Sequence, residues 1–397
     1  MRKVLMNRKA KCLTLMALLL LSRLPTETMA ADGKQQAAFA REGTAPFLFG
    51  VYHVSWSKER YEPQRYYDLN MVASNGLNAM VASLDPTSFE THYQFLERSE
   101  SKKVGLIAEL YLPALGILID LMKGYPAVIA WQIGDDFNVT NGTNYTTPEA
   151  LKARHQLAKS RDPVHLTYAS GGTAMVKWYR SFRDYHGCVD MIGMQVYPVG
   201  NKVDCPQGNA LEIAYQLFRS RVAELDGSGI IPVANLQSFS WKTKPALFPT
   251  ASESRNMLYG ALDAGVKGVL YYAFYDGKSI GGKMTLPEQC PSLWEEIGKQ
   301  AAEVKTIEPF LLDGKRSQLK TKFDKVHAMI WEKDGKRLLV LFSTERKLAR
   351  MIEINPSGPP VHDIEAVFKD RPAGLHFRDG MVSGIVGPED VHVYLIK

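Results

Sequence analysis

The chain has 397 residues, of which 45% are hydrophobic and 23% charged, a composition typical of a globular protein with room for one large domain and a smaller one. Its formal net charge of +6 is modest, and part of it comes from basic residues clustered at positions 2–9. No basic stripe is interleaved with aromatic residues, so no nucleic-acid partner is predicted.

Residues 1–30 have the three parts of a secretory signal peptide: a basic start, the apolar run "CLTLMALLLLS", and small residues at the end. The apolar run is shorter than the ~20 residues that span a bilayer. We predict cleavage after Ala30 or Ala31, a secreted or periplasmic protein, and no stable membrane anchor after cleavage. An uncleaved anchor is the alternative.

After this leader, short apolar runs alternate with amphipathic stretches. Strands are predicted at about 46–54, 77–85, 103–110, 127–133, 164–169, 189–197, 230–237 and 267–277. Helices are predicted from about 63, 88, 115, 147, 174, 209, 252 and 293; the segment 174–184 is one of them. Pro at the first helical position marks two of these starts, at Pro63 and Pro148.

Eight strand–helix units in about 260 residues predict a parallel sheet covered by helices and closed into a (β/α)8 barrel over residues 44–306. The alternative is an open, doubly wound sheet. Such a sheet usually carries a glycine-rich turn after an early strand, and "GVYHVSWSKE" has none. No cofactor is predicted.

The pattern changes from about Phe310. The segment "EKDGKR" predicts a turn between two apolar strands, and further short strands and turns follow to the end of the chain. No helical period appears there. We predict a small antiparallel β-sandwich over residues 310–397.

Polar and aromatic residues gather where the predicted barrel strands end, and the carboxyl ends of the strands carry the chemistry in such barrels. In chain order they are His53, Trp56, Asp85, Glu109, Asp135, Asp136, Gln195, Tyr197, Gln237, Trp241, Tyr272, Tyr275 and Asp276. Aromatic rings can stack on the apolar faces of a sugar, while acids and amides bind its hydroxyl groups. These positions predict a carbohydrate ligand.

Three segments carry a resemblance to a known group of enzymes. "YPAVIAWQIGDDFN" resembles the fourth strand of the clan A glycoside hydrolases, "VDMIGMQVYP" their sixth, and "GVKGVLYYAFYDG" their eighth. The C-terminal β-domain is similar to an accessory domain common in that clan. The resemblance implies a catalytic acid after the fourth strand, here Asp136, and a nucleophile after the seventh, where this chain has Gln237. Tyr197 matches the tyrosine that holds the nucleophile in the clan.

The leading hypothesis is a secreted glycoside hydrolase-like enzyme acting on a poly- or oligosaccharide. Asp136 is assigned as the general acid and Asp135 as the carboxylate that orients it. Because an amide cannot replace a nucleophilic carboxylate, the second carboxylate is expected to be Glu109, Asp85 or Asp276. The competing hypothesis is a carbohydrate-binding barrel without catalysis, and a structural surface protein is a third reading.

Two smaller features leave alternatives open. A disulfide between Cys205 and Cys290 would tie two loops on one face, whereas the alternative is three free thiols in the mature chain, with Cys188 as the third. No CxxC motif or His/Cys cluster predicts a metal site. The loop "NVTNGTNYT" contains glycosylation sequons at Asn138, Asn141 and Asn144. Of the two interpretations, glycosylation or an unmodified polar loop, we favour the unmodified loop.

Overall fold

The computed structural model describes residues 46–53, 64–84, 89–173, 178–201, 210–241, 245–275, 279–356, 358–359 and 361–397. Trp56, Asp85, Cys205 and Asp276 lie outside the described residues, as does the leader. Within the described part, no helix is both long and apolar enough to cross a membrane.

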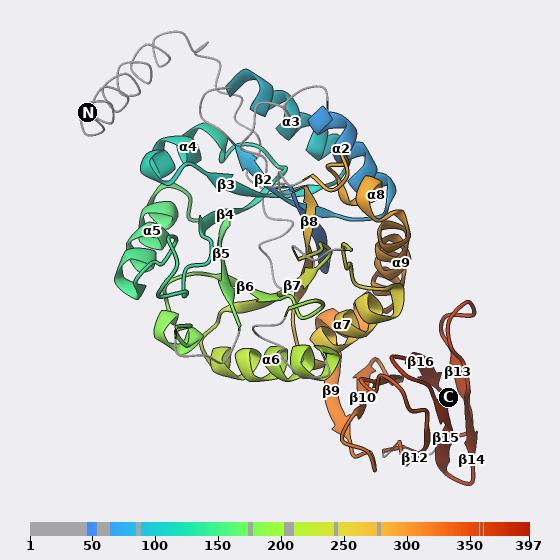
Figure 1. Cartoon of the computed structure of the whole chain (residues 1–397). Coiled ribbons are helices and arrows are strands. Elements are labelled where there is room, and N and C mark those ends of the chain that lie inside the picture. The colour runs from blue at the N-terminus through green and yellow to red at the C-terminus, as the bar shows by residue number, and fades with distance from the viewer. Residues whose placement is uncertain are drawn as a thin grey trace. The chain divides into compact units, whose positions relative to one another are not determined.

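Eight parallel strands pair in chain order and close on themselves, β1 with β8, which confirms the predicted barrel (Figure 1). The strands are β1 Leu48–His53, β2 Ala79–Leu84, β3 Gly105–Leu110, β4 Val128–Gly134, β5 Leu166–Gly172, β6 Met191–Val196, β7 Ile231–Gln237 and β8 Gly268–Tyr275. The helices around them are α2 Gln64–Ser74, α3 Phe89–Ser101, α4 Leu115–Met122, α5 Pro148–Arg161, α6 Ala210–Leu225, α7 Ala251–Ala264, α8 Leu286–Gln289 and α9 Pro291–Asp313.

Helix α7 shows how local sequence sets the ends of these elements. The Thr250 hydroxyl accepts from the Glu253 amide at 3.1 Å, and the Glu253 carboxylate accepts from the Thr250 amide at 2.9 Å, which together form a capping box. Gly265 ends the helix with φ 103°, a left-handed conformation that favours glycine. Both signals are local, so these boundaries were predictable from the sequence.

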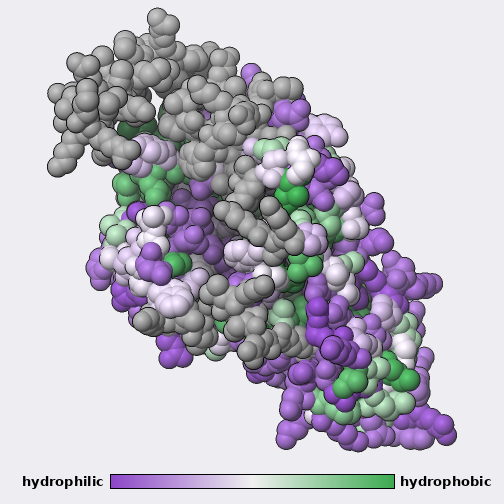
Figure 2. Space-filling model, viewed as in Figure 1, coloured by the Kyte–Doolittle hydropathy of each residue, from purple (hydrophilic) through white to green (hydrophobic). Residues whose placement is uncertain are grey.

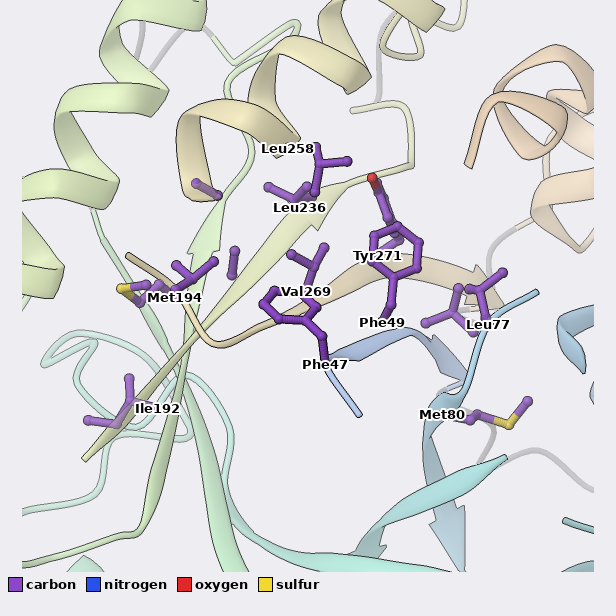
Figure 3. Packing of buried hydrophobic residues seen from close by; sticks show 14 of the residues in the cluster. Phe47, Phe49, Leu77, Met80, Ile192, Met194, Leu236, Leu258, Val269 and Tyr271 are labelled. Atoms are coloured by element: carbon purple, nitrogen blue, oxygen red, sulfur yellow. The ribbon is translucent and has the colours of Figure 1, made fainter. Parts of the chain in front are cut away.

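Two apolar layers hold the barrel together, because the strands are buried on both faces. Outward side chains pack against the helices, as Leu236 of β7 and Leu258 of α7 illustrate (Figure 3). A smaller cluster, including Val81, Ile107 and Val233, fills the barrel interior. The near-continuous apolar strands seen in the sequence follow from this double burial.

The helix predicted at 174–184 is wrong for the residues that the structure describes. Tyr179 forms an isolated bridge with Val139, and a 3-10 helix follows at Phe182–Tyr185. The amide of Thr140 donates to the Trp178 carbonyl at 2.8 Å and that of Arg180 to the Asn138 carbonyl at 2.9 Å. The backbone is therefore paired with the loop after β4 instead of with its own next turn.

The C-terminal residues form two antiparallel sheets, of order β13-β16-β11-β10-β9 and β12-β15-β14, over a shared apolar core. Their strands are β9 Lys315–Leu319, β10 Val326–Lys333, β11 Lys336–Ser343, β12 Arg350–Ile354, β13 Ile364–Ala366, β14 Leu375–Arg378, β15 Met381–Val386 and β16 Val391–Ile396. Asp334 and Gly335 form the predicted hairpin turn, both at positive φ. Helix α9 runs on past the predicted end at Thr306 to Asp313.

A buried charge network joins α7 and α9 to the C-terminal sheets. Glu303 of α9 accepts from Arg255 of α7 at 2.9 Å and from Arg371 at 2.5 Å, and Tyr259 donates to the same carboxylate at 2.8 Å. Arg255 also donates to the Val391 carbonyl at 2.7 Å. Glu303 therefore neutralises the buried Arg255 and shares Arg371 with Glu296, whose carboxylate lies 2.9 Å from that guanidinium group.

Candidate active site

Two carboxylates project from neighbouring strands at the carboxyl end of the barrel. Glu109 lies in β3, paired in register with Ser83 of β2 and Gln132 of β4. The Ser83 hydroxyl donates a hydrogen bond to the Glu109 carboxylate. Asp135 follows the last residue of β4, and the hydroxyl of Ser170 in β5 donates to it.

The pKa of Asp135 is raised to about 7. Burial is the largest cause, the charge of Asp136 is the next, and that of Glu109 adds to both; the hydrogen bond from Ser170 acts in the opposite direction. The Gln195 side chain donates to Asp135 at 3.3 Å and to the Ser170 hydroxyl at 3.2 Å, which orients the group. A carboxyl group of this kind is suited to giving up a proton near neutral pH.

Both carboxylates line one cavity of about 470 Å³. Figure 2 shows hydrophilic residues in the hollow on the visible face of the barrel. The other lining residues come from the end of β3, from β4 and from the loop and helix after it: Leu110, Tyr111, Leu112, Pro113, Gln132, Gly134, Thr143, Asn144, Tyr145, Thr146 and Arg154. The cavity thus combines two acids, one cation and two tyrosine rings.

A polar layer closes the barrel interior near the two acids. The hydroxyls of Tyr52 and Tyr168 lie 2.5 Å apart, Tyr168 donates to Asn235 at 3.0 Å, and Asn235 donates back to Tyr52 at 3.1 Å. Burial raises the pKa of both tyrosines, and the nearby charge of Asp135 adds to it. The three side chains form a closed ring of hydrogen bonds, and neither tyrosine titrates near neutral pH.

An aromatic cluster occupies the opposite side of the barrel end. Tyr272 of β8 contacts Tyr52, Tyr197 and Phe239, with ring centroids 5.4, 5.6 and 5.6 Å away. Trp241 packs on Phe239 at 5.0 Å, and its ring nitrogen donates to the Tyr197 carbonyl at 3.2 Å. Burial raises the pKa of Tyr197, and the neighbouring Tyr272 and the charge of Asp135 add to this effect.

His53, a predicted ligand-binding residue, is 1% exposed and faces α2. Its Nε2 atom lies 2.8 Å from the Asp68 carboxylate, and its ring stacks on Phe274 and Tyr275. Inward positions in β1 alternate through Leu48 and Tyr52, so residue 53 points out of the barrel. Burial lowers its pKa, which outweighs the opposite effect of Asp68.

Gln237 is fully buried, and its side chain makes three hydrogen bonds with backbone groups. Its carbonyl oxygen accepts from the Val199 amide at 2.8 Å, and its amide group donates to the carbonyls of Val199 and Phe239 at 2.9 and 3.0 Å. The side chain holds the segment after β6 against the end of β7. A glutamate at this position would place a carboxylate oxygen against the two carbonyl oxygens that the amide group now donates to. This repulsion is the physical reason for a glutamine instead of a glutamate at position 237.

The structure also separates the two adjacent aspartates. The pairing register of β4 with β5 shifts between Gln132 and Gly134, and an irregularity of this kind reverses the side-chain alternation. Asp135 consequently lines the cavity. Asp136 has φ 49° and is not among the cavity-lining residues.

Several residues of this site were not predicted from the sequence. Ser83 and Ser170 lie at inward positions of β2 and β5 and could have been found by strict alternation. Arg154 lies in α5, away from any strand end, so no rule on strand ends selects it. Among the described residues, no group of three or more His, Cys, Asp and Glu side chains is arranged to hold a metal ion.

Comparison with known proteins gives likeness in structure alone. No family model and no curated protein matches the sequence. The chain is similar to a family 39 glycoside hydrolase from the gut symbiont Bacteroides cellulosilyticus WH2, with 13% identity, a TM-score of 0.57 and coverage of 89% of this chain and 81% of that one. It is also similar to AbfB, a family 51 α-L-arabinofuranosidase from Bifidobacterium longum (11% identity, TM-score 0.58, coverage 89% and 96%).

A third similar structure is AmyP in complex with maltose, with 11% identity, a TM-score of 0.60 and coverage of 92% of this chain and 98% of that one. At such identities the likeness concerns the fold: an eight-stranded parallel barrel followed by antiparallel β-sheets. This chain therefore has a glycoside hydrolase-like fold.

Proposed function

We propose that the protein hydrolyses glycosidic bonds in a poly- or oligosaccharide, with Asp135 as the general acid and Glu109 as the second carboxylate. The observation that carries the proposal is the shared cavity, in which Asp135 has a pKa of about 7 beside Glu109. Glycoside hydrolysis needs a proton donor with a raised pKa and a second, ionised carboxylate. The assignment moves the acid from Asp136, expected from the resemblance, to its neighbour.

The strand register supports an inverting mechanism. Glu109 is level with Gln132, which is level with Tyr168 of β5, whereas Asp135 bonds to Ser170 two residues further along β5. Two residues correspond to a rise of about 7 Å. Such an offset between the two backbones favours the wider carboxyl separation of ~6.5–9.5 Å, which admits a water, over the ~5 Å of retaining enzymes. Glu109 is accordingly assigned as the base that activates this water.

The aromatic cluster opposite the acids is suited to a sugar ring. Tyr272, Tyr197 and Trp241 were predicted as ligand-binding residues from their positions at strand ends, and the structure brings them together around Phe239. Ring faces at this site would stack on the apolar face of a pyranose, while Gln195 reaches the acid side. This arrangement supports a carbohydrate as the substrate.

The test is a screen of the mature protein against a panel of poly- and oligosaccharides, together with three matched variants. Asp135→Asn and Glu109→Gln should each lose activity by about 10²–10⁴-fold, because each removes one partner of proton transfer. Asp136→Asn should lose much less, since Asn also tolerates the left-handed backbone at this position. NMR of the product should show an inverted anomeric carbon. Full activity in Asp135→Asn would contradict the proposal.

The second candidate is a barrel that binds carbohydrate without cleaving it. It is favoured by Gln237, because the chain has no carboxylate anywhere between Ile231 and Thr250, where the clan has its nucleophile. In that case the glycan panel should give binding without products, and Asp135→Asn should bind as the wild type does. Release of reducing ends by the wild type would exclude this candidate.

We also propose that the protein is exported, on the basis of the leader sequence. The support is the succession of basic, apolar and small residues in positions 1–30. N-terminal sequencing of the protein recovered from the expressing cells should begin at Ala31 or Asp32. A chain that retains its first residues and stays inside the cell would contradict export.

A further inference from the structure

Arg154 lines the same cavity as the two acids, and its contacts tie down only one edge of the guanidinium group. Its Nη1 atom donates to the Ile133 carbonyl at 3.0 Å and to the Thr146 hydroxyl at 3.3 Å. Both acceptors are neutral. In the described part of the chain this side chain forms no ion pair with a carboxylate, and burial lowers its pKa.

Three other buried or half-buried arginines of this protein are neutralised by acids. Arg221 contacts Glu224 at 2.8 Å, Arg255 contacts Glu303 at 2.9 Å, and Arg371 contacts Glu296 at 2.9 Å. The cost of desolvating a guanidinium explains this pairing. Arg154 differs from them in facing a cavity, where a ligand can supply the missing negative charge.

We propose that the cavity takes an anionic saccharide, whose carboxylate or sulfate group is bound by Arg154. The planar guanidinium offers two parallel N–H donors to such a group, a geometry that an ammonium does not provide. Tyr111 and Tyr145, which line the same cavity, would flank the sugar ring. This inference rests on the proposed function in one respect, namely that the cavity is the saccharide site.

The state of the acids is compatible with a negative ligand. At pH 7, which is about the pKa of Asp135, roughly half of the molecules carry this carboxyl group in its neutral form. The Ser83 hydroxyl donates a hydrogen bond to the Glu109 carboxylate. The cavity therefore does not carry two full negative charges near neutral pH. A substrate anion placed at the Arg154 side would meet one cation there.

The experiment compares matched ligands by titration calorimetry on the full mature protein carrying Asp135→Asn, so that no ligand is consumed. The probes are galacturonate and glucuronate oligosaccharides, their neutral methyl esters, and a sulfated oligosaccharide. An anionic ligand should bind about 10- to 100-fold more tightly than its neutral counterpart, as expected for a charge-assisted hydrogen-bond pair. The uronate and sulfate arms decide which anion the cavity selects.

In the same Asp135→Asn protein, a second substitution Arg154→Gln should abolish the preference for the anionic ligand. Arg154→Lys should keep part of the preference because the charge remains. Arg161→Gln is the control, since Arg161 lies on the same helix but is exposed and pairs with Asp120 at 3.0 Å. That variant should keep the full preference. If Arg154→Gln does not fold, the protein that keeps Arg154 is titrated at increasing salt concentration. Binding of the anionic ligands should weaken with added salt, whereas binding of the methyl esters should not.

Equal affinity for anionic and neutral members of every pair would overturn the inference. Its failure is distinguishable from that of the proposed function. Hydrolysis of neutral glycans without any anion preference defeats this inference alone. An Arg154-dependent preference in a wild-type protein that cleaves no glycan supports the anion site and defeats the hydrolase.

Discussion

Replacing Asp135 by Asn should lower hydrolysis and, at the same time, make the stability of the protein fall less between pH 5 and pH 8 than that of the wild type. Both effects have one cause, which is the raised pKa of this buried carboxyl group. The folded protein holds the proton up to a pH of about 7, whereas the unfolded chain releases it at ~3.9. The stability that the neutral group contributes is therefore full below pH ~3.9 and lost as the pH rises through about 7.

These two pKa values give the magnitude. The contribution to the free energy of unfolding is at most ~2.7 kcal/mol at pH 5 and close to zero at pH 8. Asp135→Asn has no titrating group at this position, so its free energy of unfolding should not show this decrease between pH 5 and pH 8. The change in stability caused by Asp135→Asn should consequently be more favourable at pH 8 than at pH 5, by up to about 2.5 kcal/mol.

The assay is urea unfolding of both proteins at pH 5 and pH 8, beside initial rates of glycan hydrolysis. Other titrating groups cancel when the two proteins are compared at each pH. Asp136→Asn is the intermediate case: it removes the second cause of the raised pKa of Asp135 but leaves the burial, so its stability should fall less steeply with pH than that of the wild type. Equal pH dependence of stability in wild type and Asp135→Asn would refute the raised pKa. Unchanged hydrolysis would refute the role as acid.

Three further substitutions test the architecture. Gln237→Glu should lower the free energy of unfolding at pH 7 by at least about 2 kcal/mol in urea, because it removes two hydrogen-bond donors to backbone carbonyls. The variant should not become a retaining enzyme, and a stable, retaining variant would contradict the structural role of the amide. Glu303→Gln should cost about 3–5 kcal/mol, because it leaves the buried Arg255 without its carboxylate, although Arg371 keeps Glu296. Glu295→Gln on the exposed face of α9 should cost little, and similar losses would refute the network. Gly193→Ala should lower the melting temperature strongly, because its Cβ would collide with the Tyr168 hydroxyl and lie 2.6 Å from the Asn235 amide; a neutral effect would show that the polar layer can move.

Much of the scaffold was determined by the sequence itself. Eight alternations of apolar strands and amphipathic helices predict a closed barrel, because each strand must be buried on both faces. Helix boundaries such as Thr250 and Gly265 depend on hydrogen bonds within a few residues, so they too could be read locally. The rule that strands present their polar residues at the carboxyl end was enough to bring Glu109 and the Asp135–Asp136 pair to one region.

What the sequence did not decide is where individual side chains at this end point. The register shift in β4 turns Asp135 inward in place of Asp136, and such a shift depends on pairing with β5, far along the chain. The segment 178–185 is not the predicted α-helix because its backbone bonds to the loop after β4. Gln237 and His53 do not face a ligand because their side chains bind Val199 and Asp68 within the protein. Arg154 reaches the cavity only because α5 packs beside the end of β4, so the tertiary structure, through contacts distant in sequence, decides which residues face the ligand.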